Sequence, residues 1–171
     1  LTGREIKKRL GSDIVIEPYS DDQLNPNSYN LRLHGELMVY KADVLDAKIK
    51  NETETFTIPE DGFVLCPGEL YLARTEEYTE TKNLVPMILG RSSVGRLGIT
   101  VHITSGFGDI GFAGYWTLQL TCVKPVRIYP GMKICQIFYH TPYGEYDEYV
   151  SKKYQGSKGI VESKIYEEIK K

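Results

Sequence analysis

The chain has 171 residues, and its 21 Lys and Arg residues against 23 Asp and Glu residues give a formal net charge of −2. This length favours one domain with an ample core. The balanced, interspersed charge argues against a nucleic-acid-binding stripe or a membrane-seeking surface. The three cysteines, Cys66, Cys122 and Cys135, form no Cys-x-x-Cys pair. We therefore expect reduced, buried thiols in a cytoplasmic protein, without a disulfide framework or a structural zinc site.

The N-terminal residues predict a short amphipathic helix. Residues 2–5 have the pattern of a capping box, and Gly11 is a stop signal. Residues 14–16 then predict a strand that ends before Pro18, followed by a polar loop over residues 20–27. The apolar runs along the chain are only as long as strands, so we expect no secretory or transmembrane segment.

From residue 29 onward the pattern is that of β-strands. Tyr29, Leu31 and Leu33 alternate with polar residues, which is typical of a half-buried strand. Further runs rich in strand-forming residues lie at 37–40, 53–58, 62–66, 70–74, 85–89, 99–104, 115–123, 126–129 and 133–140. With one terminal helix and a short turn after Ser92, this spacing predicts an all-β jelly roll or β-barrel. The charged stretch 40–54 is interpreted as a surface excursion, and residues from about 141 to 171 as an arm.

Residues 88–119 carry most of the groups that suit a phosphorylated ligand. Gly90 precedes Arg91, Ser92 and Ser93, and Arg96 follows about one helical turn later. Backbone amides, hydroxyls and a guanidinium group can together form a cradle for an anion. An ordinary polar turn is the alternative interpretation.

A second loop, residues 105–114, is rich in glycine. Gly106, Gly108, Gly111 and Gly114 permit close backbone approach and positive φ, and Asp109 is the only carboxylate among these residues. Such a loop could approach a flat ligand. A bulged turn with a solvated aspartate is the alternative.

Several motifs in this order resemble those of the dCTP deaminase and dUTPase superfamily. They are residues 25–33, 90–98, 106–114, 131–138 and 153–160, so the resemblance spans almost the whole chain. It implies a distorted β-barrel of the dUTPase-like type, in one domain of residues 1–171, with a homotrimer whose sites lie between subunits. Gly106 is typical of the bifunctional branch, which converts dCTP to dUMP and pyrophosphate, whereas monofunctional deaminases usually have His there.

The resemblance also implies roles for individual residues. The substrate would be dCTP or dUTP, with dTTP as a possible inhibitor, and Mg²⁺ would bind through the phosphates, with neither zinc nor a nucleic-acid partner. Asp109 would meet the sugar 3′-hydroxyl and the hydrolytic water, and Arg96 would orient residue 119. The remaining substrate contacts would come from the phosphate-binding set Arg91, Ser92, Ser93 and Gln136, the base-reading set Thr104, Ser105, Gly106 and Phe107, and the arm residues Tyr146, Lys153 and Tyr154.

One position departs from the family pattern. The triplet Thr117-Leu118-Gln119 matches a Thr-Leu-Glu whose glutamate is the general base for deamination. An amide cannot take a proton from water near neutral pH, and loss of a positioned base costs about 10²–10⁴-fold in rate. Asp109 could still support attack on the α-phosphate, so the alternatives are a dUTPase without deamination and a non-catalytic nucleotide-binding regulator. His102, between Val101 and Ile103, is interpreted as a structural residue.

Overall fold

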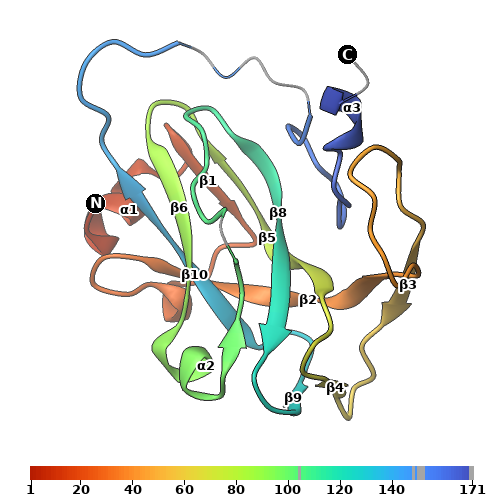
Figure 1. Cartoon of the computed structure of the whole chain (residues 1–171). Helices are drawn as coiled ribbons and strands as arrows, with labels where there is room; N and C mark the ends of the chain where they lie inside the picture. Colours follow the sequence, from red (N-terminus) through yellow and green to blue (C-terminus); the bar gives the residue numbers. More distant parts are fainter. Residues whose placement is uncertain (104, 148, 150–152, 170–171) are drawn as a thin grey trace.

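The computed structural model describes residues 1–103, 105–147, 149 and 153–169, and most of its strands form one bent sheet that nearly closes into a barrel (Figure 1). The sheet runs in the order β6 (Val85–Gly90), β10 (Lys133–His140), β2 (Tyr29–Tyr40), β5 (Tyr71–Thr81), β8 (Ala113–Cys122) and β7 (Ile99–Thr100), with β1 (Ile14–Glu17) on β5 and β3 (Thr53–Thr57) on β2. A separate two-stranded sheet joins β4 (Phe63–Leu65) to β9 (Val126–Ile128). The all-β prediction is therefore confirmed.

The described residues of 101–103 and 105–108 form backbone bonds to two separate sides of the main sheet. On the β6 side, the Ile88 amide donates to the Gly106 carbonyl at 2.6 Å, and the Gly108 amide donates to the Pro86 carbonyl at 2.9 Å. On the β8 side, the Gln119 amide donates to the Val101 carbonyl at 3.0 Å. These bonds satisfy backbone groups that an open sheet would leave unpaired at its edges. They also place the glycine-rich loop directly beside β8.

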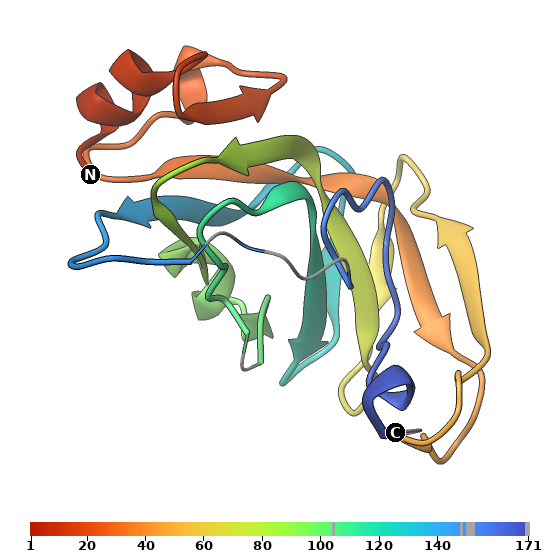
Figure 2. The same cartoon turned by 90° about the horizontal axis from the view of Figure 1, so that it is seen from above.

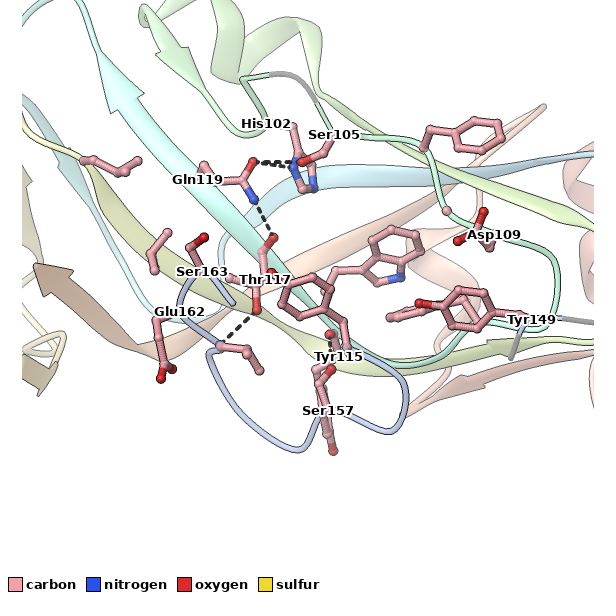
Figure 3. Close-up of a pocket in the computed structure, with 18 of the residues that line it drawn as sticks. His102, Ser105, Asp109, Tyr115, Thr117, Gln119, Tyr149, Ser157, Glu162 and Ser163 are labelled. Atoms are coloured by element: carbon pink, nitrogen blue, oxygen red, sulfur yellow. Dashed lines mark hydrogen bonds between the residues drawn. The ribbon is translucent and has the colours of Figure 1, made fainter. Parts of the chain in front are cut away.

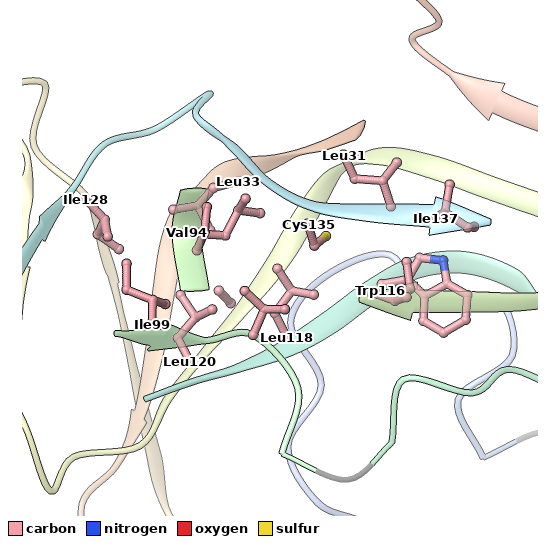
Figure 4. Close-up of a cluster of buried hydrophobic side chains, with 14 of the residues drawn as sticks. Leu31, Leu33, Val94, Ile99, Trp116, Leu118, Leu120, Ile128, Cys135 and Ile137 are labelled. Atoms are coloured by element: carbon pink, nitrogen blue, oxygen red, sulfur yellow. The ribbon is translucent and has the colours of Figure 1, made fainter. Parts of the chain in front are cut away.

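The core fills the barrel with side chains from alternate positions of its strands (Figure 4). Along β8, Trp116, Leu118 and Leu120 are buried. Because successive side chains of a strand point to opposite faces, the intervening residues Tyr115, Thr117 and Gln119 lie on the outer face. A packed interior thus fixes the position of the face that carries Gln119.

The N-terminal helix α1 (Gly3–Arg9) begins as predicted. The Thr2 hydroxyl accepts a hydrogen bond from the Glu5 amide at 3.3 Å, and Ile6 packs into the core. The loop that follows β1 contains a short 3₁₀ helix, η1 (Asp21–Gln23). Two further helices are short, α2 (Ser92–Arg96) after β6 and α3 (Tyr166–Ile169) in the arm.

Some boundaries differ from those predicted, and β5 shows the clearest reason. It was expected to end at residue 74, but it continues to Thr81 through a polar run. Glu77 in that run is fully buried, and it accepts hydrogen bonds from Gln23 and from both the backbone and the guanidinium of Arg32. These partners compensate for burial of a charge, which sequence pattern alone does not reveal.

Other corrections are smaller. The runs 29–33 and 37–40 belong to one strand, β2, whereas the run 99–104 is a strand only over Ile99–Thr100. The thiol expected to be buried at Cys66 is exposed, while Cys122 and Cys135 are buried, and all three are free. In the described part of the chain, no helix is long and apolar enough to span a membrane.

Candidate functional site

A cavity of about 440 Å³ lies on the outer face of β8, between the glycine-rich loop and the returning arm (Figure 3). This volume is in the range of small-molecule sites. The described residues that line it are mainly aromatic and polar: Tyr40, Leu70, Leu72, His102, Ser105, Phe107, Gly108, Asp109, Phe112, Tyr115, Trp116, Thr117, Gln119, Tyr149, Tyr154, Ser157, Val161, Glu162 and Ser163.

The side chain of Gln119 is held at both ends inside this cavity. Its Oε1 lies 2.9 Å from Nδ1 of His102 and accepts a weaker bond from the Ser105 hydroxyl at 3.4 Å. Its amide nitrogen donates to the Thr117 carbonyl at 3.4 Å. Because an amide oxygen can only accept, Nδ1 of His102 carries the proton in this arrangement.

His102 was interpreted from the sequence as a structural residue, but it lines the cavity and contacts Gln119. It follows the short strand β7, and the 101–108 segment brings it against Gln119 across 17 positions of sequence. Burial lowers the pKa of His102 below its ordinary value, and the bond to Gln119 opposes that shift only in part, so the imidazole is neutral at pH 7. No local pattern predicts this contact, because it depends on the register between distant segments.

The glycine-rich loop is shaped by close packing against the protein itself. A Cβ atom built on Gly106 would overlap the Ile88 carbonyl oxygen, and one on Gly108 would overlap the ring of Trp116. Gly111 and Gly114 have φ angles of 87° and 150°. Lack of space therefore favours glycine at positions 106 and 108, and a positive φ favours it at positions 111 and 114. It presents Asp109 and Phe107 at the cavity, where both are exposed.

The arm returns beside β8 and forms another wall of the cavity (Figure 2). The Gly156 amide donates to the Ala113 carbonyl at 2.8 Å, and the Tyr115 amide donates to the Ser157 carbonyl at 3.2 Å. The Ser157 hydroxyl adds a bond to the Tyr115 carbonyl at 2.8 Å. This is the geometry of a strand added to a sheet, so the arm is anchored mainly through its backbone.

Of the arm residues expected at the site, only Tyr154 lines the cavity. Lys153 forms an ion pair with Glu168 and lies over the Tyr154 ring, with its Nζ 5.5 Å from the ring centre. Tyr146 is exposed outside the cavity. Thr104, expected to read the base, lies outside the described residues.

The expected phosphate-binding residues gather at a second place, around α2. Ser92 and Ser93 are exposed in its first turn, and the Arg91 guanidinium donates to the Lys133 carbonyl at 3.0 Å. Gln136 of β10 donates to the Gly90 carbonyl at 3.3 Å and accepts from the Ser28 hydroxyl at 2.8 Å. None of these residues lines the cavity of the same chain.

Arg96 is also separate from the cavity within one chain. It is exposed at the end of α2, and in the described structure the side chain of Gln119 bonds instead to His102, Ser105 and Thr117. The role expected for Arg96 at position 119 stays a prediction for an assembly of several chains.

Comparison with known proteins agrees with this architecture. The family described as dCTP deaminase-like matches residues 1–141. The chain belongs to the dCTP deaminase-like family. A dUMP-forming dCTP deaminase of Hathewaya histolytica is 60% identical over 168 residues, which cover 98% of each chain. Another of that name, from Cytophaga hutchinsonii, is 60% identical over 171 residues and covers 100% of this chain and 99% of its own.

The fold of this dCTP deaminase-like chain also has a solved counterpart. A 2′-deoxycytidine 5′-triphosphate deaminase from Agrobacterium tumefaciens superposes with a TM-score of 0.66 at 18% identity. The match covers 86% of this chain and 49% of that one. The resemblance seen in the motifs is thus confirmed at the level of family and fold.

The charge of the cavity bears on how a member of the dCTP deaminase-like family could bind a triphosphate. Its described lining includes two carboxylates, Asp109 and Glu162, and neither lysine nor arginine. A triphosphate carries several negative charges and needs cationic partners or a metal ion. In the described part of the chain no group of three or more His, Cys, Asp or Glu could hold a metal. Among the described lining residues, no lysine or arginine is therefore in place to meet such charges.

Proposed function

We propose that this chain acts on pyrimidine deoxynucleoside triphosphates and converts dCTP toward dUMP and pyrophosphate. The names of the relatives that are 57–60% identical over nearly their full length support this activity. The observation that carries it is the cavity on β8, where the glycine-rich loop with Asp109 faces the hydrogen-bonded pair His102 and Gln119 (Figure 3).

The reaction has two hydrolytic steps. In one, water adds to C4 of cytosine and ammonia leaves. In the other, water attacks the α-phosphorus and pyrophosphate leaves. Asp109 is exposed at the cavity and suits the second step, because a carboxylate can orient or deprotonate the attacking water.

Gln119 makes the deamination step the slower one. Its Oε1 already accepts from His102 and Ser105, and an amide does not take up the proton that water must lose. Without a positioned base this step is slowed by about 10²–10⁴-fold. Gln119 therefore favours a second candidate function, a dUTPase that forms dUMP and pyrophosphate from dUTP.

The phosphate site is completed by a second copy of the chain. The cavity has no described cationic side chain of its own, whereas the set around α2 offers Arg91, Arg96 and two hydroxyls that do not line this cavity. A homotrimer would bring the α2 set of one subunit to the cavity of the next, since the head-to-tail interfaces of a three-membered ring pair unlike surfaces. Mg²⁺ bridging the phosphate oxygens would offset the charges of Asp109 and Glu162.

The direct test is to incubate the purified protein with Mg²⁺ and either dCTP or dUTP, and to follow ammonia and pyrophosphate separately. Both products from dCTP support the bifunctional reaction. Pyrophosphate from dUTP without ammonia from dCTP selects the dUTPase. Neither product from either substrate refutes both functions, and dTTP added to an active reaction tests inhibition.

A further inference from the structure

Two contacts tie the arm to the end of β2 and to the loop between β2 and β3. Nζ of Lys50 lies 2.9 Å from Oε1 of Glu162, and the Ser163 amide donates to the Tyr40 hydroxyl at 3.0 Å. On the opposite side, the Val161 amide donates to the hydroxyl of Thr117 on β8 at 3.1 Å. Residues 161–163 are thus held between the barrel and the surface excursion, which ends close to the arm in Figure 1.

Glu162 occupies an unusual position among the surface ion pairs. Its side chain is only 16% exposed and lines the cavity, whereas Lys50 is 63% exposed. The hydrogen bond from Lys50 is the largest cause of a lowered pKa for Glu162, and the positive charge of Lys164 acts in the same direction. The carboxylate is therefore ionised at neutral pH, and Lys50 is the cation in contact with it.

We propose that Lys50 is a positioning residue for nucleotide binding, because it neutralises Glu162 and keeps residues 161–163 closed over the cavity. This inference rests on the proposed function, since the ligand it concerns carries a triphosphate. Loss of Lys50 has two effects that both weaken binding. The negative charge of Glu162 loses its contacting cation at the wall of the cavity, and residues 161–163 lose one of the three contacts described above.

The kinetic test compares K50A, E162Q and K50A/E162Q with the wild-type protein, using dUTP and Mg²⁺. K48A is the matched control, because it removes the same charge from the same loop two residues away. Exposed ion pairs contribute little, so we expect K50A to raise KM by about two- to five-fold with kcat unchanged. E162Q removes the charge that Lys50 neutralises, so the double variant should match E162Q. Equal KM values for K50A and K48A would overturn the proposal, as would fully additive effects.

Amide hydrogen exchange tests the closure of the arm without any substrate. The amides of Val161 and Ser163 should exchange faster in K50A than in the wild-type protein and K48A, while those of β8 keep their protection. Unchanged exchange in K50A refutes the proposal that Lys50 keeps residues 161–163 closed over the cavity, even if the enzyme is active. A wild-type protein that releases no pyrophosphate refutes the proposed function instead, so the two failures are distinguishable.

Discussion

At the scale of single residues, the contact between His102 and Gln119 determines which chemistry position 119 can support. The amide oxygen of Gln119 accepts from the imidazole N–H, and Gln119 stands where the resemblance of the motifs predicts a glutamate. A carboxylate fits the same space but differs in two respects. It can accept a proton from water, and its negative charge would favour the protonated imidazole. The chemistry at this position therefore depends on one atom, the amide nitrogen.

Changing Gln119 to Glu should raise ammonia release from dCTP by about 10²–10⁴-fold, because it supplies the missing base. Pyrophosphate release from dUTP should change much less, since we propose Asp109 for that step. Coupled assays of ammonia and pyrophosphate on the same preparations measure both. Q119N is the control that alters the side chain without adding a carboxylate. Ammonia release by Q119E no faster than by Q119N would show that position 119 is not the site of the base.

The buried imidazole also predicts how stability depends on pH. Burial lowers the folded-state pKa of His102 below its ordinary value, and it does the same for His34, which is less buried. The unfolded chain then binds more protons between the folded pKa and about 6.5. The contribution of these neutral histidines to the free energy of unfolding is therefore fully present above that pH range, and it is lost as the pH falls through the range.

Urea denaturation at pH 7.5 and pH 5.8 should show a lower free energy of unfolding at the lower pH. In H102Q this decrease should be smaller, because the contribution of His102 is removed. The pKa values of Asp21 and Asp22 are lowered, so these carboxylates change the stability only at more acidic pH and do not affect the comparison between pH 7.5 and pH 5.8. An identical decrease in both proteins would exclude His102 as the cause.

Among the elements, the 101–108 segment has the most demanding role. Its backbone bonds to Ile88 and Pro86 on one side and to Gln119 on the other connect β6 with β8. The same bonds present His102, Ser105 and Asp109 to the cavity. Closure of the sheet and assembly of the site are therefore one structural event, and damage to the segment should affect both.

Changing Gly106 to Ala should destabilise the protein by about 1–3 kcal/mol, because the added methyl group overlaps the Ile88 carbonyl oxygen. Chemical denaturation measures this cost. G159A is the control, since a Cβ there meets nothing within 4 Å. If G106A is as stable as G159A, the close approach of loop and strand does not constrain this position.

At the scale of the whole molecule, the groups of one chain divide into two incomplete halves. The cavity holds Gln119 and Asp109 but no described cationic side chain, while Arg91 and the two serines lie around α2. A subunit by itself should then bind the triphosphate poorly. The proposed trimer predicts that each half can be supplied by a different chain.

Mixing subunits tests this prediction. R91A and D109A should each lose most pyrophosphate release from dUTP. Co-expression of the two should restore it to about one quarter of the wild-type level, because random assembly leaves that share of interfaces with both residues intact. Two copies of R91A, separately tagged and co-expressed, are the control. No recovery in the mixed R91A and D109A trimers would place both residues in the same subunit's site.

Much of this architecture follows from the sequence itself. Alternation along 115–123 and the glycine spacing of 105–114 predict a strand and a close loop, because both depend on neighbouring residues. The order of motifs identifies the family, and the cap at Thr2 predicts the first helix. The sequence did not predict the polar second part of β5, residues 75–81, because the hydrogen-bond partners of Glu77 are remote in sequence.

Only the tertiary structure decided which of these parts meet. It placed His102 against Gln119, the arm on β8, and Lys50 against Glu162, and it separated the α2 set from the cavity. Each of these outcomes depends on the register between segments and on how the sheet closes. Local periodicity sets the face on which a side chain lies, but chain folding in three dimensions sets the partner that it finds there.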